Sequence, residues 1–320
     1  MYMDNKQLLQ SRKIPSRTGD PVTRAMLERF IAFMDASPRT IETYAKALRQ
    51  FFNFLSSRQV NHPAREDVLA FKEHLKEGRK AGTTQLYITA VRRFFSWTEQ
   101  EGLFPNIAEH IKGAKVDRRH KKCGLTSAQA KNVLGSIDLT DTRGIRDHAI
   151  LALMLTTGLR TIEVARADIE DMSVIADSAV LFVQGKGRDD KAEYVKLAAP
   201  VEWAIRAYIR AVGPVDRGKP LFGSLAAKNR LGRLSTRSIS RIVKTRLQAA
   251  GYDDDRLTAH SLRHTAGTLN LLNGGTLEET QQLLRHSNIN TTMIYSHHLQ
   301  REKNNSEERI AATIFNASDA

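Results

Sequence analysis

The sequence has almost no cysteine and no long apolar run. Its single cysteine, Cys123, excludes an intrachain disulfide framework and a metal cluster built from several cysteines. No apolar stretch approaches the length of a membrane span, and residues 1–20 lack the apolar core of a signal peptide. We therefore expect a cytoplasmic protein with no membrane contact.

Acidic residues are also fewer than basic residues. The chain has 35 Asp and Glu against 49 Lys and Arg, which gives a formal charge of +14 and a pI near 10.0. Such an excess attracts polyanions, so nucleic acid is the expected partner, although charge alone names no reaction. With 320 residues, 41% of them hydrophobic, the chain is long enough for two domains with cores of their own.

The first half of the chain has a helical pattern from Pro21 to Lys112. Helices are expected to begin near Arg24, near Pro38 with Ser37 as its cap, and then after Pro63 and from about Thr83. Apolar and aromatic residues recur at helical spacing in each segment, so we expect them to form a core and not to stack on DNA bases.

Basic residues occupy the other faces of these predicted helices. Most surface Lys and Arg are simply solvated, but at this density about half should contact phosphate groups. The candidates for DNA binding in this half are Lys46, Arg49, Arg79, Lys80, Arg92 and Arg93.

The second half begins after a basic stretch, residues 113–124, that has too few apolar residues to form a core and is interpreted as a linker. Residues 146–157 are strongly apolar and predict a buried helix. Residues 179–183 and 193–197 predict a β-hairpin, whose tip carries Lys186 and Arg188, and Arg188 is a further candidate for DNA binding. From Pro200 onward the pattern is helical again.

Four separated pieces of this half carry reactive or phosphate-binding side chains. They are Thr157–Glu163 with the sequence TGLRTIE, Lys186, Ala259–Thr265 with the sequence AHSLRHT, and LRHS at 284–287 followed by Tyr295. Each piece alone is more often structural than catalytic, because short motifs arise frequently by chance.

Together, and in this order, the pieces resemble the tyrosine recombinases, also called the phage integrase family. The resemblance runs from about Pro21 to the C-terminus. It implies a mainly α fold with a small antiparallel β-sheet, in which a helical core-binding (SAM-like) bundle precedes an α+β catalytic domain. The predicted boundaries are 1–20 for an N-terminal extension, 21–112 for the bundle, 113–124 for the linker, 125–300 for the catalytic domain and 301–320 for a tail.

The resemblance also implies a role for each matching residue. Arg160 and Arg263 match the two arginines that clamp the scissile phosphate, supported by Glu163. The remaining matches are Lys186 as the hairpin lysine, His260 as the first histidine, His286 at a position held by His or Trp, and Tyr295 as the nucleophile. One departure is Arg285, which stands where the family usually has glycine.

The chemistry of these side chains suits cleavage of a phosphodiester. Arginine offers a planar, permanently charged fork that matches phosphate oxygens. A free tyrosine has a pKa of about 10, so we expect the nearby cations to favour its phenolate and His260 to accept its proton. Lys186 would protonate the departing 5′ oxygen. These cations replace a metal ion, so no metal and no cofactor is expected.

The expected function is therefore site-specific recombination of double-stranded DNA by integration, excision or resolution. The resemblance implies a 3′-phosphotyrosyl intermediate, a Holliday junction and a homotetramer on two sites, without ATP, and it leaves room for an accessory factor that bends DNA or sets direction. A DNA-binding regulator that has lost catalysis and a monomeric enzyme resembling type IB topoisomerases are the alternatives.

Two further expectations concern the ends of the chain. About 25 residues precede the first predicted helix, too few for a further folded DNA-binding domain. This favours a simple recombinase, with mobile-element integrase and chromosome-dimer resolvase both left open. The tail carries an apolar stripe of Ile310, Ile314 and Phe315, which in the family docks on a neighbouring protomer. Docking on its own domain is the alternative.

Overall fold

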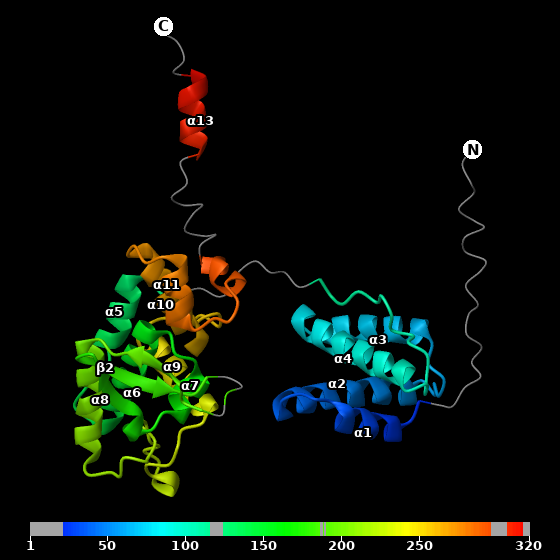
Figure 1. Cartoon of the computed structure of the whole chain (residues 1–320), viewed down its shortest axis with the longest axis horizontal. Coiled ribbons are helices and arrows are strands. Elements are labelled where there is room, and N and C mark those ends of the chain that lie inside the picture. Colours follow the sequence, from blue (N-terminus) through cyan, green and yellow to red (C-terminus); the bar gives the residue numbers. More distant parts are fainter. Residues whose placement is uncertain (1–21, 116–123, 186–187, 189, 296–305, 316–320) are drawn as a thin grey trace. The chain divides into compact units, whose positions relative to one another are not determined.

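The computed structural model describes residues 22–115, 124–185, 188, 190–295 and 306–315 (Figure 1). The chain divides into two compact units, Met1–Arg119 and His120–Ala320, and each is described by itself. The predicted extension 1–20, most of the linker with Cys123, and Lys186 lie outside the described residues.

The N-terminal unit consists of helices whose starts follow the capping signals in the sequence. Ser37 accepts a hydrogen bond from the Thr40 backbone, with Pro38 in the first turn, as predicted. Asp67 accepts one from the Ala64 backbone at the start of the third helix. The helices are α1 (Arg24–Phe33), α2 (Pro38–Ser57), α3 (Arg65–Gly78) and α4 (Ala81–Gln100).

Aromatic rings fill the core of this unit. Phe51, Phe94 and Phe95 are completely buried, and neighbouring rings meet edge to face, as between Phe30 and Phe94 at 5.6 Å and 88°. Such pairs are favoured by the positive edge and negative face of the ring. The prediction of an aromatic core is confirmed, and the core continues past α4 as far as Ile111.

The second unit is mainly helical with one small sheet, which confirms the predicted fold class. Residues 290–295 also form a helix, which carries Tyr295. The other elements are α5 (Ser127–Gly135), α6 (Thr142–Thr157), α7 (Thr161–Arg166), η1 (Ile169–Asp171), β1 (Met172–Ile175), β2 (Ser178–Val183), β3 (Glu193–Lys196), α8 (Ala199–Val212), η2 (Ala227–Asn229), α9 (Thr236–Ala249), α10 (Ala259–Leu272), α11 (Leu277–Leu284) and α13 (Ser306–Phe315).

The sheet has the order β1-β2-β3 and is antiparallel throughout. Val180 of β2 lies opposite Ser173 of β1 and Lys196 of β3. The β2–β3 hairpin was predicted, but β1 was not. Strand β1 has only four residues, and three of them are exposed, so no alternation of buried and exposed side chains marks it in the sequence.

The second unit contains the predicted catalytic domain and is called the catalytic unit below. Helix α6 forms its centre and packs against α8 and α10. It begins at Thr142, with Asp141 as its cap, and not at Arg146 as predicted. It ends at Gly158, whose φ of 62° lies in the left-handed region. A Cβ at Gly158 would lie 2.5 Å from the Leu284 side chain, so both the turn and the close approach of α11 require glycine here.

The described part of the chain offers neither a membrane span nor a metal cluster. None of its helices is long and apolar enough to cross a membrane. Likewise, these residues contain no group of three or more His, Cys, Asp and Glu side chains that could hold a metal ion.

Candidate active site

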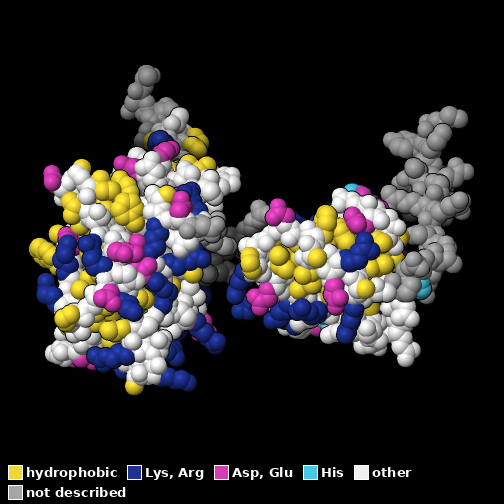
Figure 2. All heavy atoms as spheres, turned by 60° about the horizontal axis from the view of Figure 1, so that its bottom comes forward, with side chains coloured by type: hydrophobic (Ala, Val, Ile, Leu, Met, Phe, Trp, Pro, Cys, Tyr) yellow, Lys and Arg dark blue, Asp and Glu magenta, His cyan; other side chains and the backbone are white. Residues whose placement is uncertain are grey.

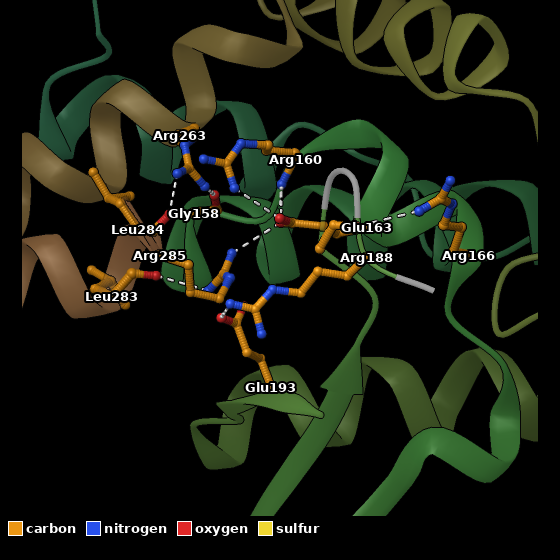
Figure 3. Close-up of polar contacts among 11 residues, drawn as sticks. Gly158, Arg160, Glu163, Arg166, Arg188, Glu193, Arg263, Leu283, Leu284 and Arg285 are labelled. Atoms are coloured by element: carbon orange, nitrogen blue, oxygen red, sulfur yellow. Dashed lines mark hydrogen bonds and ion pairs between the residues drawn. The ribbon is translucent and has the colours of Figure 1, made fainter. Parts of the chain in front are cut away.

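The catalytic unit brings together pieces of chain that lie far apart in the sequence. The turn from α6 to α7 supplies Arg160, α10 supplies Arg263, and the turn after α11 supplies Arg285 (Figure 3). His286 follows in the same turn, and Tyr295 lies on the next helix.

Arg263 is fixed at the centre of this arrangement. Its side chain is fully buried, and it donates from Nη1 to the Gly158 carbonyl at 2.5 Å and from Nη2 to the Leu284 carbonyl. Burial, followed by the charge of Arg160, lowers the pKa of Arg263 to about 10, so the guanidinium stays protonated near neutral pH. Arg263 therefore joins the ends of α6 and α11 while keeping its positive charge.

Glu163 holds the second arginine. Its carboxylate is fully buried and accepts from the Arg160 backbone at 2.7 Å, from Arg160 Nη1 at 2.9 Å and from Arg285 Nη2 at 3.0 Å. Burial alone would raise the pKa of Glu163, but the charge of Arg285 and the contacts with Arg160 outweigh it and hold the pKa below its usual value. The carboxylate thus stays ionised between two guanidinium groups.

Tyr295 lies in a small apolar cluster with Ala266 and Leu284. A Cβ at Gly267 would lie 3.4 Å from two carbons of the Tyr295 ring, so Tyr295 packs closely against α10. We expected nearby cations to favour the phenolate. Burial instead raises the Tyr295 pKa above its ordinary value, although the charges of Arg263 and Arg160 act in the expected direction.

A row of aromatic rings leads to Tyr295. The rings of His260 and His264 are 4.7 Å apart, and the His264 ring lies 5.1 Å from that of Tyr295. The His286 ring is nearly parallel to that of Tyr295, with their centroids 6.4 Å apart and an angle of 8° between the planes. Sequence reasoning assigned no role to His264, although it stands within the HSLRHT motif. Its spacing, four residues after His260 on one helix, places both rings on the same face.

His286 is kept neutral by its surroundings. Burial, together with the charges of Arg263, Arg160 and other groups, lowers its pKa to about 4. Its Nδ1 lies 2.9 Å from the Thr292 hydroxyl. If that hydroxyl donates to Nδ1, the neutral ring carries its proton on Nε2 and can donate there.

Lys186 itself lies outside the described residues, but residues on both sides of it in the sequence are anchored. Arg166 of α7 donates to the Gly185 carbonyl at 3.4 Å, and Arg188 forms an ion pair with Glu193 of β3 at 3.1 Å. Helix α7, which begins next to Arg160, therefore also contacts the hairpin that carries Lys186.

A second ionic group anchors the chain at Lys191, just before β3. Lys191 contacts Asp168 at 2.8 Å and Asp171 at 2.6 Å, and Arg233 contacts Asp168 at 2.5 Å. These contacts raise the pKa of Lys191 against the opposing effect of burial. The lysine stays charged, and the hairpin is tied to η1 and to the segment before α9.

The basic candidates of the N-terminal unit all lie on its surface. Figure 2 shows Lys and Arg side chains gathered on the lower part of this unit in the view drawn. Two of them lie over aromatic rings, Arg79 over Tyr87 at 5.4 Å and Arg93 over Tyr44 at 5.6 Å. The exposed residues are Lys46, Arg49, Arg79, Lys80, Arg92 and Arg93.

Comparison with known proteins identifies the family. The model of the phage integrase family matches residues 124–302, and that of the phage integrase N-terminal SAM-like domain matches residues 27–102. The chain belongs to the phage integrase family. It is 33% identical over 285 residues to tyrosine recombinase XerC of Herpetosiphon aurantiacus, which covers 85% of this chain and 90% of the relative.

Solved structures of this family share the fold. A crystal structure of the site-specific recombinase XerH bound to palindromic difH substrate has a TM-score of 0.71 at 22% identity and covers 90% of this chain and 84% of that one. A lambda integrase tetramer bound to a Holliday junction has a TM-score of 0.69 at 16% identity and covers 91% and 83%. Family membership makes this chain a tyrosine recombinase, an enzyme of site-specific DNA recombination.

Proposed function

We propose that Tyr295 attacks a specific phosphodiester in duplex DNA and forms a 3′-phosphotyrosyl bond. The P–O5′ bond breaks and releases a 5′ hydroxyl. Attack of a 5′ hydroxyl from the partner strand then breaks the Tyr295–phosphate bond and restores the tyrosine. Bond energy is retained in the intermediate, so resealing consumes no nucleotide.

Arg160 and Arg263 carry the phosphate-binding role in this proposal. The observation that supports it most directly is that the charges of Arg263 and Arg160 both act to lower the pKa of the buried Tyr295, against the effect of its burial. Two cations at the non-bridging oxygens stabilise the charge of the pentacoordinate transition state. Neutral His286 would add a hydrogen bond from Nε2 without a further charge.

Proton transfer completes the proposed cycle. Tyr295 must lose its proton at attack, and His260 would accept it; the His264 ring contacts the rings of both residues. Because burial raises the pKa of Tyr295 in the DNA-free chain, we infer that the tyrosine stays protonated until DNA is bound. Lys186 would then protonate the 5′ oxygen as it departs.

A suicide DNA substrate tests the proposal. Its nicked strand loses a short fragment after cleavage, so the covalent protein–DNA adduct accumulates and is counted on a denaturing gel. The parent chain should form the adduct and the Tyr295→Phe variant should not, while both bind the site equally. Adduct formation by Tyr295→Phe, or its absence from the parent chain, would contradict the proposal and favour another nucleophile or a DNA-binding regulator.

The same assay tests the general acid. Lys186→Ala should cleave ordinary DNA slowly but cleave a substrate with a 5′-bridging phosphorothiolate at nearly the parent rate, because sulfur departs without a proton. If the phosphorothiolate does not restore cleavage, the acid is another group, with His286 and His260 next to be examined.

For assembly, we propose a homotetramer on two DNA sites, with a Holliday junction between the two strand exchanges, acting in the cytoplasm. The tail helix α13 supports this proposal, because Ile310 and Ile314 are 59% and 63% exposed within one chain. Burial of large apolar side chains contributes about 1.5–3 kcal/mol each, enough to drive cooperative binding. We infer that the tail docks on a neighbouring protomer.

Truncation after Gln300 distinguishes the two docking modes. With docking on a neighbour, a single half-site should bind as before, and cooperative occupancy of the second half-site should be lost in a gel-shift titration. Reduced thermal stability with unchanged cooperativity would indicate docking within one chain.

Relaxation of plasmids without a specific site would favour topoisomerase-like activity.

A further inference from the structure

Arg285 has an unusual place in the active site. It ends α11 with φ 50° and ψ 51°, in the left-handed region where glycine is the natural residue. From there its side chain, only 9% exposed, reaches Glu163, which lies 122 positions earlier in the chain (Figure 3). It also donates from Nη1 to the Leu283 carbonyl at 2.8 Å.

We propose that Arg285 is a positioning residue of the recombination reaction. By binding one oxygen of the Glu163 carboxylate, Arg285 leaves the remaining donors of Arg160 for the scissile phosphate. The inference rests on the function proposed above. Arg285 acts through Glu163 and through the turn that carries His286, and it does not touch the reacting atoms.

The sharing of Glu163 supports this role. Arg160 Nη1 donates to Oε1, whereas Oε2 accepts from the Arg160 backbone and from Arg285. With Oε2 occupied in this way, the carboxylate does not form a two-point pair with the Arg160 guanidinium. The remaining donors of Arg160, whose side chain is 31% exposed, are therefore left for a ligand that approaches from outside.

The same arginine connects two parts of the site. Its contact with Glu163 holds the start of α7, and its contact with Leu283 holds the last turn of α11. The next carbonyl, that of Leu284, accepts from Arg263. Two guanidinium groups thus bind consecutive carbonyls at the end of α11, next to His286, and satisfy acceptors that the helix leaves open.

Packing alone does not account for Arg285. An arginine in the left-handed region is strained where glycine would not be, and its buried Nε–H has no partner within the described residues. Its charge is among the causes that lower the pKa of Arg263 and of His286. Arg285 therefore acts electrostatically on two residues of the proposed phosphate-binding site.

Single-turnover cleavage of the suicide substrate at saturating DNA tests the inference. Arg285→Gly relieves the backbone strain, and we expect it to fold normally and bind the site as the parent does. Its cleavage rate should fall by about 10²-fold, which is typical when a reacting group is misplaced by about an ångström. Arg285→Lys keeps the charge but cannot reach both acceptors, so it should be slowed as well. Asp177→Gly, which relieves a left-handed residue in the exposed β1–β2 turn, is the matched control and should cleave at the parent rate.

A double variant shows whether Arg285 acts through Glu163. In a Glu163→Gln background the shared carboxylate is gone, so adding Arg285→Gly should slow cleavage much less than it does in the parent, because only the Leu283 contact is then lost. Three results would each overturn the inference while leaving the proposed function intact. They are rate effects of Glu163→Gln and Arg285→Gly that multiply in the double variant, cleavage by Arg285→Gly at the parent rate, and cleavage by Arg285→Lys at the parent rate. A parent chain that forms no adduct would overturn both.

Discussion

The two units of this recombinase differ in how deeply their ion pairs are buried. In the N-terminal unit, the ion pairs among the described residues join side chains that are each at least 39% exposed. In the catalytic unit, Arg146 with Asp147 and Arg285 with Glu163 pair while no more than 9% exposed. The N-terminal unit keeps these ion pairs on the surface around an aromatic core, whereas the catalytic unit also builds ion pairs into its interior.

The roles proposed for the two units account for this difference. A surface that follows a phosphate backbone needs cations but little geometric precision, so it does not need buried ion pairs. A site that stabilises a phosphoryl transition state needs cations held in fixed directions and shielded from water. Buried arginines cost solvation energy, and the catalytic unit offsets that cost with carboxylates and backbone carbonyls.

The largest effect is expected from a substitution of Arg263, which is a buried charge of the catalytic unit. Arg263→Lys loses the fork that binds the Gly158 and Leu284 carbonyls, so cleavage should fall by about 10²–10³-fold and melting should occur at a lower temperature. Arg160→Lys should lose a similar amount of cleavage while melting nearly as the parent does, since Arg160 is partly exposed. Equal melting of the two variants would contradict the structural role given to Arg263.

The aromatic core gives the next largest effect. Phe94→Ala should destabilise the N-terminal unit by about 3–5 kcal/mol and weaken site binding, because Phe94 is fully buried among other rings. In calorimetry the catalytic unit should keep its own transition. Leu69→Ala, at a position that is 40% exposed, serves as the control and should change little. Joint melting of both units in Phe94→Ala would show that they are not independent.

Surface cations should give a smaller effect, and one without loss of stability. Arg92→Ala and Arg93→Ala should each weaken DNA binding and reduce the slope of log affinity against log salt by about 0.9 for each phosphate that the variant no longer neutralises. Thermal melting should change little, because both side chains are exposed and the contact of Arg93 with the Tyr44 ring is at the surface. An unchanged salt dependence would remove these residues from the DNA-binding surface.

The smallest expected effect is a pH dependence from His286. The pKa of His286 is about 4 in the folded chain, against an ordinary value of 6.5. Between pH 4 and 6.5 this side chain therefore binds a proton in the unfolded chain but not in the folded chain. Stability should therefore fall as the pH is lowered from 6.5 to 4, and His286→Asn should lose less stability over that range. Thermal melting of both proteins at a series of pH values measures the difference. Parallel curves would contradict the lowered pKa.

The fold was largely predictable because its signals are local. The cap at Ser37, the apolar run of α6 and the breaking residue Gly158 each act within a few positions, so their elements could be placed from sequence. Strand β1 was missed because its stability comes from pairing with β2, and its exposed side chains carry no pattern of their own.

The site was predictable in its residue types but not in its electrostatics. Motifs named Arg160, Arg263 and Tyr295, and the structure places all three in one region of the catalytic unit. The contact between Arg285 and Glu163 joins residues far apart in the chain and depends on a left-handed backbone at an arginine, which no local pattern announces. The raised pKa of Tyr295 likewise reflects burial that only the assembled unit creates.

The anchoring of Arg263 has a genetic consequence. A substitution there loosens the ends of α6 and α11 together, so the variant should be degraded and an intact copy of the gene in the same cell should work normally. Loss of the Tyr295 hydroxyl leaves a folded protein that still occupies DNA sites and, in the proposed tetramer, joins intact subunits. Null alleles at position 263 should therefore be recessive, and Tyr295→Phe should be dominant over the parent gene.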